Sequence, residues 1–303
     1  MALKSSKRHT EVSALTTKNY HPQFFAYLNF ELGVMGAMQL NDEEKSTGQL
    51  TEQTLQDVAL HLKSEGYVIL HKVMPQSWVT AMRSLFCAEL EANYRDQPSQ
   101  LASQNGHGGF QPPLKAPFLD PSIIENEIVF QILEYTLGKH FFGCLPYGCN
   151  TSFPGSTTQN VHRDCGHLFP ELDLALPPLL IVVNILLDEF TESNGATQIW
   201  PGSHRHIEAD QAEISTLKIA PSRWSEHPSV RTTAPAGSII IRDMRTWHRG
   251  MSNTTDALRT MLSLVYYRQH LLPDNLRSSD EVINEDDWQQ LSERAKWIYR
   301  LWK

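Results

Sequence analysis

The stretch QNVHRDCGH, residues 159–167, brings two histidines, an arginine, an aspartate and a cysteine together in a short segment. In an extended strand alternate side chains point to the same face, so His162 and Asp164 would present an imidazole and a carboxylate side by side. These are two of the three ligands in the 2-His-1-carboxylate triad, which holds non-heme Fe(II) and leaves coordination positions open. The spacing therefore suggests a metal site that needs one more ligand.

A His-x-acid triplet is weak evidence alone, because the chain contains 13 histidines and 34 acidic residues and short motifs match by chance. Two other triplets begin at His9 and His206. His9 falls in a polar terminal stretch that cannot hold ligand geometry, and His206 follows a turn sequence with no strand pattern around it. Only His162 shortly precedes a β-rich region, so it is the triplet that the rest of the sequence can support.

A third ligand is available farther along the chain. His248 lies in a polar loop between the strand-like runs GSIIIRD (237–243) and TMLSLVYY (260–267). Neighbouring strands of a jelly roll can place this loop opposite His162 and Asp164. Arg259 follows His248 by 11 residues, at the mouth of the next strand. Its permanently charged, planar guanidinium could bind a carboxylate there through two hydrogen bonds.

The composition narrows the class of protein. With 303 residues, 41% hydrophobic and 20% charged, the chain is typical of a soluble globular protein with a sizeable core. The net charge of -8 and the absence of a basic stripe argue against a nucleic-acid partner, and no apolar run approaches the ~20 residues that span a bilayer. We therefore expect a cytoplasmic protein with no membrane partner and with free cysteine thiols.

The expected elements divide the chain into an N-terminal arm and one domain. Residues 1–18 lack the apolar core of a signal peptide and read as a flexible arm, whereas residues 19–303 form a single domain. Its part from about 50 to 140 is mostly helical. A Gly- and Pro-rich stretch, QNGHGGFQPPLKAPFLDP (104–121), interrupts that part; we expect it to be irregular and to form a mobile lid over a pocket.

Short β-branched runs dominate the chain from about 145 to 270, and turn residues separate them. This pattern of short strands and turns predicts a mainly β fold with flanking helices and a jelly-roll, cupin-like core. Apolar residues at helical spacing then predict one C-terminal helix over about 284–303. Its tryptophans, Trp288 and Trp302 among them, could pack on the core or serve a homodimer interface.

Three segments carry a family resemblance: HRD (162–164), NGATQIWPGSHR (194–205) and WHRGMSNTTDALR (247–259). Together with the weaker EGYVIL (65–70), they resemble the phytanoyl-CoA dioxygenase family of Fe(II)/2-oxoglutarate-dependent oxygenases. The residues of these motifs are most similar to those of the branch found in fungal natural-product pathways. The resemblance extends from about Leu55 to Tyr267, which is most of the chain.

The resemblance implies a double-stranded β-helix core in which His162, Asp164 and His248 hold iron. Arg259 would pair with the far carboxylate of 2-oxoglutarate. Gln159 and Thr197 match positions that help to seat this cosubstrate, although both could equally serve local structure.

The implied reaction consumes O2, releases succinate and CO2, and oxidises a C–H bond of a small, largely apolar secondary metabolite, with ascorbate as the usual reductant in vitro. The carboxylate of Asp164 argues against halogenation, because related halogenases replace that residue with a small one.

The residues that could contact a substrate follow less directly. Phe110 and Gln111 in the expected lid, Asn150 on a strand entering the core, and His167 beyond the ligand pair are our candidates; plain loop packing is the alternative for each. The acidic balance weighs against a CoA thioester, but four arginines leave it open: Arg163, Arg242, Arg245 and Arg249.

Two other functions stay open at this point. A His-Asp-His site in a jelly roll could hold zinc or manganese and serve a hydrolase or an isomerase, and a protein of the same fold could bind a small molecule without catalysis. Arg259 favours the oxygenase, because the other chemistries have no need of a dicarboxylate anchor at that place.

Overall fold

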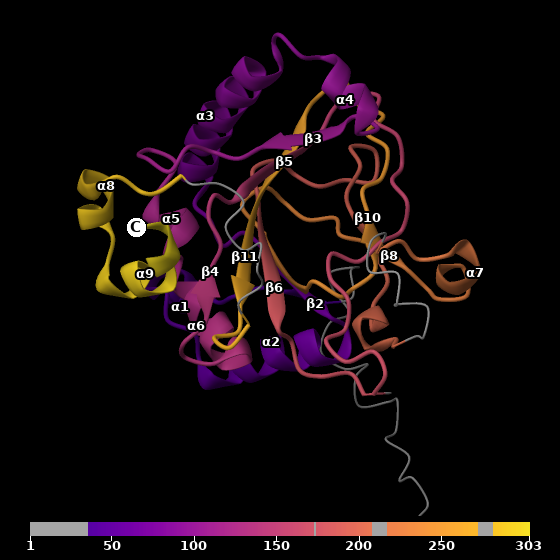
Figure 1. The fold of residues 1–303 in the computed structure, drawn as a ribbon, viewed down its shortest axis with the longest axis horizontal. Helices are drawn as coiled ribbons and strands as arrows, with labels where there is room; N and C mark the ends of the chain where they lie inside the picture. Colours follow the sequence, from indigo (N-terminus) through magenta and orange to yellow (C-terminus); the bar gives the residue numbers. More distant parts are fainter. Residues whose placement is uncertain (1–35, 173, 208–216, 272–280) are drawn as a thin grey trace, which may run out of the picture. The chain divides into compact units, whose positions relative to one another are not determined.

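A computed structural model describes residues 36–172, 174–207, 217–271 and 281–303. These residues all fall within one compact unit (Figure 1). The predicted arm, residues 1–18, lies outside the described residues.

Two sheets form the core, as the jelly-roll prediction requires. In the eight-stranded sheet the strands are antiparallel neighbours except for the parallel pair β1–β2, and β10–β7–β8 form a second, antiparallel sheet. The large sheet runs in the order β1 (Ala37–Met38), β2 (Tyr67–Leu70), β9 (Ile239–Asp243), β6 (Leu180–Leu186), β11 (Arg259–Tyr267), β5 (Gly148–Ser152) and β3 (His107–Phe110), with β4 (Phe142–Gly143) also on β11. The small sheet contains β10 (His248–Arg249), β7 (Gln198–Ile199) and β8 (Val230–Arg231).

Helices cover one face of the large sheet. Apolar side chains of α2, α3 and α6 join alternate strand residues in one buried cluster, because successive side chains of a strand point to opposite faces. In the view of Figure 1, α2 and α6 lie near the lower ends of the central strands, and α3 lies near their upper ends. The helices are α1 (Asp42–Thr47), α2 (Glu52–Ser64), α3 (Gln76–Tyr94), α4 (Ser99–Ser103), α5 (Pro121–Ile124), α6 (Glu127–Leu137), α7 (Pro221–Trp224), α8 (Glu285–Gln290) and α9 (Glu293–Ile298), with 3-10 turns at Ser203–Arg205 and Arg300–Trp302.

The glycine-rich stretch contains a regular element, so the prediction that residues 104–121 are irregular throughout is wrong. His107–Phe110 form the edge strand β3, which pairs with β5. The glycines serve close packing here: a Cβ at Gly109 would lie 2.4 Å from the carbonyl oxygen of Cys149. The stretch thus supplies a fixed sheet edge over at least these four residues.

The C-terminal segment also differs from the single predicted helix. Leu291 is extended, and Ser292 caps a new helix by accepting a hydrogen bond from the Ala295 amide, which separates α8 from α9. Trp288 and Trp302 are buried in the main apolar cluster, while Trp297 is exposed. The segment therefore serves the core, and its role in a homodimer stays a prediction.

The remaining structural predictions concern membranes and thiols. None of the helices in the described ranges has the length and apolarity that crossing a bilayer would require. No disulfide joins any of the four cysteines in the described part of the chain: Cys87, Cys144, Cys149 and Cys165.

Candidate active site

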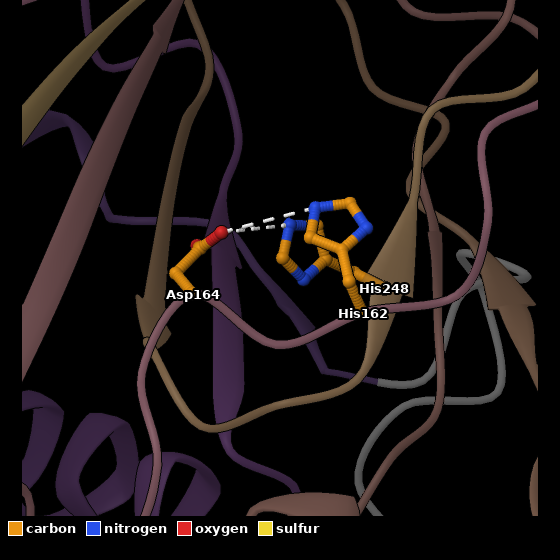
Figure 2. Close-up of side chains that lie close together, drawn as sticks. All are labelled: His162, Asp164 and His248. Carbon is orange, nitrogen blue, oxygen red and sulfur yellow. Dashed lines mark ion pairs between the residues drawn. The ribbon is translucent and has the colours of Figure 1, made fainter. Parts of the chain in front are cut away.

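Three side chains converge at the place where the sequence predicts a metal. The Oδ1 atom of Asp164 lies 3.9 Å from Nε2 of His162 and 3.5 Å from Nε2 of His248, and Figure 2 shows the three groups pointing toward one another. One ligand atom from each residue lies within 4.8 Å of the other two. This is the only such cluster of His, Cys, Asp and Glu side chains among the described residues.

The backbone brings the ligands together without the strand that we predicted through residues 162–164. His162 forms isolated antiparallel bridges to His248 and to Lys218, and it exchanges backbone hydrogen bonds of 3.0 and 2.8 Å with His248. Asp164 lies in a bend. The Asp164 amide donates to the carbonyl of Met244 at 2.9 Å. The ligand pair is thus held by the 244–248 loop, because the backbone of each ligand residue is bonded to that loop.

Hydrogen bonds orient both imidazoles for metal binding. Nδ1 of His162 lies 2.9 Å from the carbonyl of Asn160, and Nδ1 of His248 lies 3.0 Å from that of Thr246. A carbonyl only accepts, so Nδ1 of His162 carries a proton and its Nε2 presents a lone pair to the site. Nδ1 of His248 also lies 3.2 Å from Nη1 of Arg242, which is a donor, and Nε2 of His248 faces Asp164. Burial and the charge of Arg242 lower the pKa of His248 to about 3, so this ring is neutral at neutral pH, as a metal ligand must be.

Asp164 is held by an arginine that sequence reasoning did not assign to the site. Arg242 on β9 donates from Nη2 to Oδ2 of Asp164 at 2.6 Å, which leaves Oδ1 facing the histidines. Burial works to raise the pKa of Asp164, but its interactions with His248 and Arg242 outweigh burial and hold that pKa well below its usual range. The carboxylate is therefore ionised and offers one oxygen to the site.

This donor set fits Fe(II). Two imidazoles and one carboxylate form the facial triad typical of non-heme iron oxygenases, and all three residues line a cavity of about 760 Å³ between the two sheets. The side of the triad that opens on the cavity leaves room for further ligands.

Arg259 lies in the same cavity and is prepared for an anion. Its Nη2 donates to the Gly195 carbonyl at 3.0 Å, its guanidinium carbon lies 4.4 Å above the centre of the Phe190 ring, and its buried Nε has no hydrogen-bond partner within the described part of the chain. Burial lowers its pKa to about 10, which leaves it charged at neutral pH. A buried cation with an unused donor fits the distal carboxylate of 2-oxoglutarate.

The NGAT turn supports Arg259 through its backbone. Gly195 has a φ of +83°, and a Cβ there would come within 2.5 Å of the Met251 carbonyl, so the turn needs glycine. Thr197 and Gln159 both line the cavity. The Gln159 side chain accepts from the Gly250 amide at 2.9 Å, which leaves its own amide nitrogen available, so their predicted roles toward the cosubstrate are sterically open.

The predicted substrate residues separate into two groups. Phe110, Gln111 and Asn150 line the cavity, but His167 does not. His167 is buried near Arg163 and Arg245, and burial, reinforced by these charges, lowers its pKa to about 4. The structure therefore places His167 behind the site and gives no support to a substrate contact.

Other residues of the cavity wall escaped sequence reasoning. His107 points Nε2 to the Thr157 carbonyl at 2.8 Å and follows a glycine-rich pattern that we read as loop. Seven further wall residues lie in strands, where only the alternation of faces could have found them: Val182, Asn184, Ile199, Ile240, Met261, Ser263 and Val265.

Arg242, Arg245 and Arg249, which were among the arginines that left a CoA thioester open, are bound within the chain. Arg242 pairs with Asp164, Arg245 pairs with Asp243 at 2.6 Å, and Arg249 donates to Gln198 at 2.8 Å. These bonds leave the three side chains poorly suited to bind the phosphates of CoA.

Comparison with known proteins finds a family model and curated relatives that match the chain. A family model described as phytanoyl-CoA dioxygenase matches residues 62–261. The chain is 23% identical over 258 residues to dioxygenase ALT11 of Alternaria alternata, covering 80% of each protein. It is 28% identical over 182 residues to the iron/alpha-ketoglutarate-dependent dioxygenase ausU of Aspergillus calidoustus, covering 59% of this chain and 57% of that one.

Solved structures share the fold. The non-heme alpha ketoglutarate dependent carbocyclase SnoK from nogalamycin biosynthesis superposes with a TM-score of 0.54 at 19% identity, covering 77% of this chain and 92% of that one. The epimerase SnoN, in complex with Fe3+, alpha ketoglutarate and nogalamycin RO, gives a TM-score of 0.50 at 17% identity over 74% and 92% of the two chains.

Proposed function

The chain belongs to the phytanoyl-CoA dioxygenase family, and from this membership we propose that it oxidises a C–H bond of a small, largely apolar secondary metabolite. It is a non-heme iron dioxygenase that uses 2-oxoglutarate. The observation that carries the site assignment is that one cavity contains both the His162, Asp164 and His248 cluster and a buried arginine with an unused donor, Arg259.

Different side chains of the cavity would bind the metal and the cosubstrate. Iron(II) and 2-oxoglutarate, when bound, supply with O2 an oxidant that removes hydrogen from a nearby C–H bond, and 2-oxoglutarate leaves as succinate and CO2. His162, Asp164 and His248 would hold the metal, and Arg259 would hold the distal carboxylate of 2-oxoglutarate. Thr197 and Gln159 would line the space between them.

Orientation is the contribution of the remaining cavity wall. The substrate would lie against Val182, Ile240 and Val265 on the sheet and against Phe110 at the edge. Which C–H bond faces the iron decides between hydroxylation, desaturation and oxidative rearrangement.

Several observations favour a natural-product substrate. Curated relatives include fungal dioxygenases, and SnoK and SnoN, which share the fold, come from nogalamycin biosynthesis. The carboxylate of Asp164 argues against halogenation, since it takes the place that a halide would need. Family membership likewise sets aside a zinc or manganese hydrolase or isomerase.

The test is oxidative turnover with a matched histidine control. Purified protein supplied with Fe(II), ascorbate, O2 and a library of apolar metabolites should release succinate from 2-oxoglutarate. His162→Ala should abolish this release, and His140→Ala, which changes an exposed histidine beside Trp297, should leave it unchanged. Full-length protein that binds neither Fe(II) nor 2-oxoglutarate by calorimetry would exclude the proposal.

A further inference from the structure

Three uncharged polar side chains form a hydrogen-bonded cluster on the cavity face of the large sheet. Nδ2 of Asn184 on β6 donates to Oγ of Ser263 on β11 at 2.7 Å, and Nδ2 of Asn150 on β5 donates to the same oxygen at 2.9 Å. All three residues line the cavity. We call these three residues the amide–hydroxyl cluster. None of them is needed to bind the metal or the distal carboxylate of 2-oxoglutarate.

The register of the strands places this cluster in the middle of the sheet. Asn184 is opposite Ser263 on one side and Ile240 on the other. Ile240 lies two positions before Arg242, the partner of the Asp164 carboxylate. The cluster is therefore on the same face of the large sheet as Arg242, one step of the strand alternation away from the arginine that bonds to Asp164.

Burial of Asn184 is unusual for its surroundings. It is 6% exposed in the otherwise apolar run LIVVNIL, where an amide costs free energy unless its hydrogen bonds are made. An apolar residue would have served packing alone. The polar group points into the cavity, so a partner for it can come from a ligand.

The hydrogen bonds within the cluster are incomplete. Oγ of Ser263 accepts from both asparagines, so its own O–H must donate elsewhere, and no acceptor for it lies among the hydrogen bonds of the described residues. The Oδ1 atoms of Asn150 and Asn184 likewise receive no hydrogen bond there. Turning either amide by 180° exchanges a donor for an acceptor, but the cluster still offers both to the cavity.

Two glycines keep the space beside the cluster open. Gly109 is opposite Asn150, and Gly148 is opposite Ser263. A Cβ at Gly109 would lie 3.1 Å from Oδ1 of Asn150, and one at Gly148 would lie 3.2 Å from it. Side chains at these positions would crowd the Asn150 amide. Glycine at both positions therefore keeps that amide in place and open to the cavity.

We infer that Asn150, Asn184 and Ser263 bind an uncharged oxygen group of the substrate, a carbonyl or a hydroxyl, and thereby fix which C–H bond faces the iron site. The inference rests on the proposed function and adds a recognition element to it. A charged carboxylate is not the expected ligand, because the cluster is neutral and the two cations on this face of the sheet have other partners: Arg242 is paired with Asp164, and Arg259 is assigned to 2-oxoglutarate. The substrate is then an apolar skeleton with at least one oxygen group set apart from the reacting carbon.

The experiment uses three probes that share one skeleton: trans-decalin, trans-2-decalone and trans-2-decalol. Full-length protein labelled with 15N-asparagine is loaded with Fe(II) and 2-oxoglutarate under argon, and calorimetry first verifies the loading. Failure to load would count against the proposed function, whereas every later result concerns the cluster. Each probe is then titrated at equal concentrations while the side-chain amide signals of Asn150 and Asn184 are followed by NMR.

The two oxygenated probes should move these amide signals, and trans-decalin should not. They should also bind roughly three- to tenfold more tightly than trans-decalin, the range expected for a neutral hydrogen bond. Binding of the ketone alone would point to the Ser263 hydroxyl as donor, and binding of the alcohol alone to an asparagine oxygen as acceptor; both results support the inference.

Variants separate recognition from folding. Asn184→Leu and Ser263→Ala should each remove the preference for the oxygenated probes while retaining 2-oxoglutarate binding; the second only shortens a side chain, so it serves if the first does not fold. Gln104→Leu, which removes an exposed amide at the cavity rim, should keep the preference. Amide signals that none of the probes moves, or a preference that survives in Ser263→Ala, would overturn the inference.

Discussion

The two faces of the large sheet use the same strands for different purposes. On β6, Ile181, Val183 and Ile185 point to the helices and are buried in the main apolar cluster, whereas Val182 and Asn184 point to the cavity. The strand β11 repeats the division with Leu262 and Leu264 on the helix side, and with a row on the cavity side that consists of Arg259, Met261, Ser263 and Val265.

The difference shows where polar groups can be tolerated. On the helix face a polar atom is buried away from any ligand, which costs free energy unless the protein itself supplies a hydrogen-bond partner. That face is therefore mostly apolar, and the buried hydroxyls of Thr151 and Thr260 there bond to each other at 3.0 Å. On the cavity face polar and charged groups can meet a ligand, so Asn184, Arg242 and Arg259 occur there. The helix face therefore supplies stability, and the cavity face supplies chemistry.

The sharpest test of this division is a truncation on the helix face. Leu264→Ala should lower the free energy of unfolding by roughly 3 kcal/mol, because it leaves a cavity in a packed core. Val265→Ala, the next residue and on the cavity face, should cost clearly less because Val265 is half-buried. Urea denaturation of the two variants measures this, and equal losses of stability would contradict the division.

On the cavity face the largest effect should come from the cosubstrate anchor. Arg259→Leu should weaken 2-oxoglutarate binding by on the order of 30- to 100-fold, since a charge-assisted hydrogen-bond pair is lost, while Fe(II) binding persists. Isothermal titration with each ligand measures both. Arg268→Leu provides the control, because Arg268 binds backbone carbonyls beyond the other end of β11; unchanged affinity in Arg259→Leu would refute the anchor role.

A smaller effect is expected from the arginine behind the metal ligand. Arg242→Gln should weaken Co(II) binding, followed by its visible absorption, about tenfold, because partners that orient a ligand contribute to metal affinity. Arg249→Gln changes an arginine that bonds to Gln198 and not to a ligand, and it should bind Co(II) as the wild type does. Equal affinities in the two variants would show that Asp164 does not depend on Arg242.

The local sequence pattern was sufficient to predict features that depend only on residue type and spacing. The β-rich region from about 145 to 270 was predicted from short apolar runs, and His162, Asp164 and His248 were predicted to converge, as the structure has them. Arg259 was placed correctly at the start of a strand. Composition misled the prediction at β3. Its glycines suggested a loop, but in the structure they permit close pairing of β3 with β5.

The sequence by itself determined the candidate metal donors, the cationic residue proposed to anchor 2-oxoglutarate and the β-rich class, because these depend on side-chain chemistry, spacing and local alternation. Only the tertiary structure decided that an isolated bridge, and not a strand, joins His162 to His248, that Arg242 takes one oxygen of Asp164, and that Asn150, Asn184 and Ser263 meet. The physical reason is strand register. Residues far apart in the chain become neighbours only through pairing across the sheet, and a polar residue within an apolar run does not reveal which residue it will face.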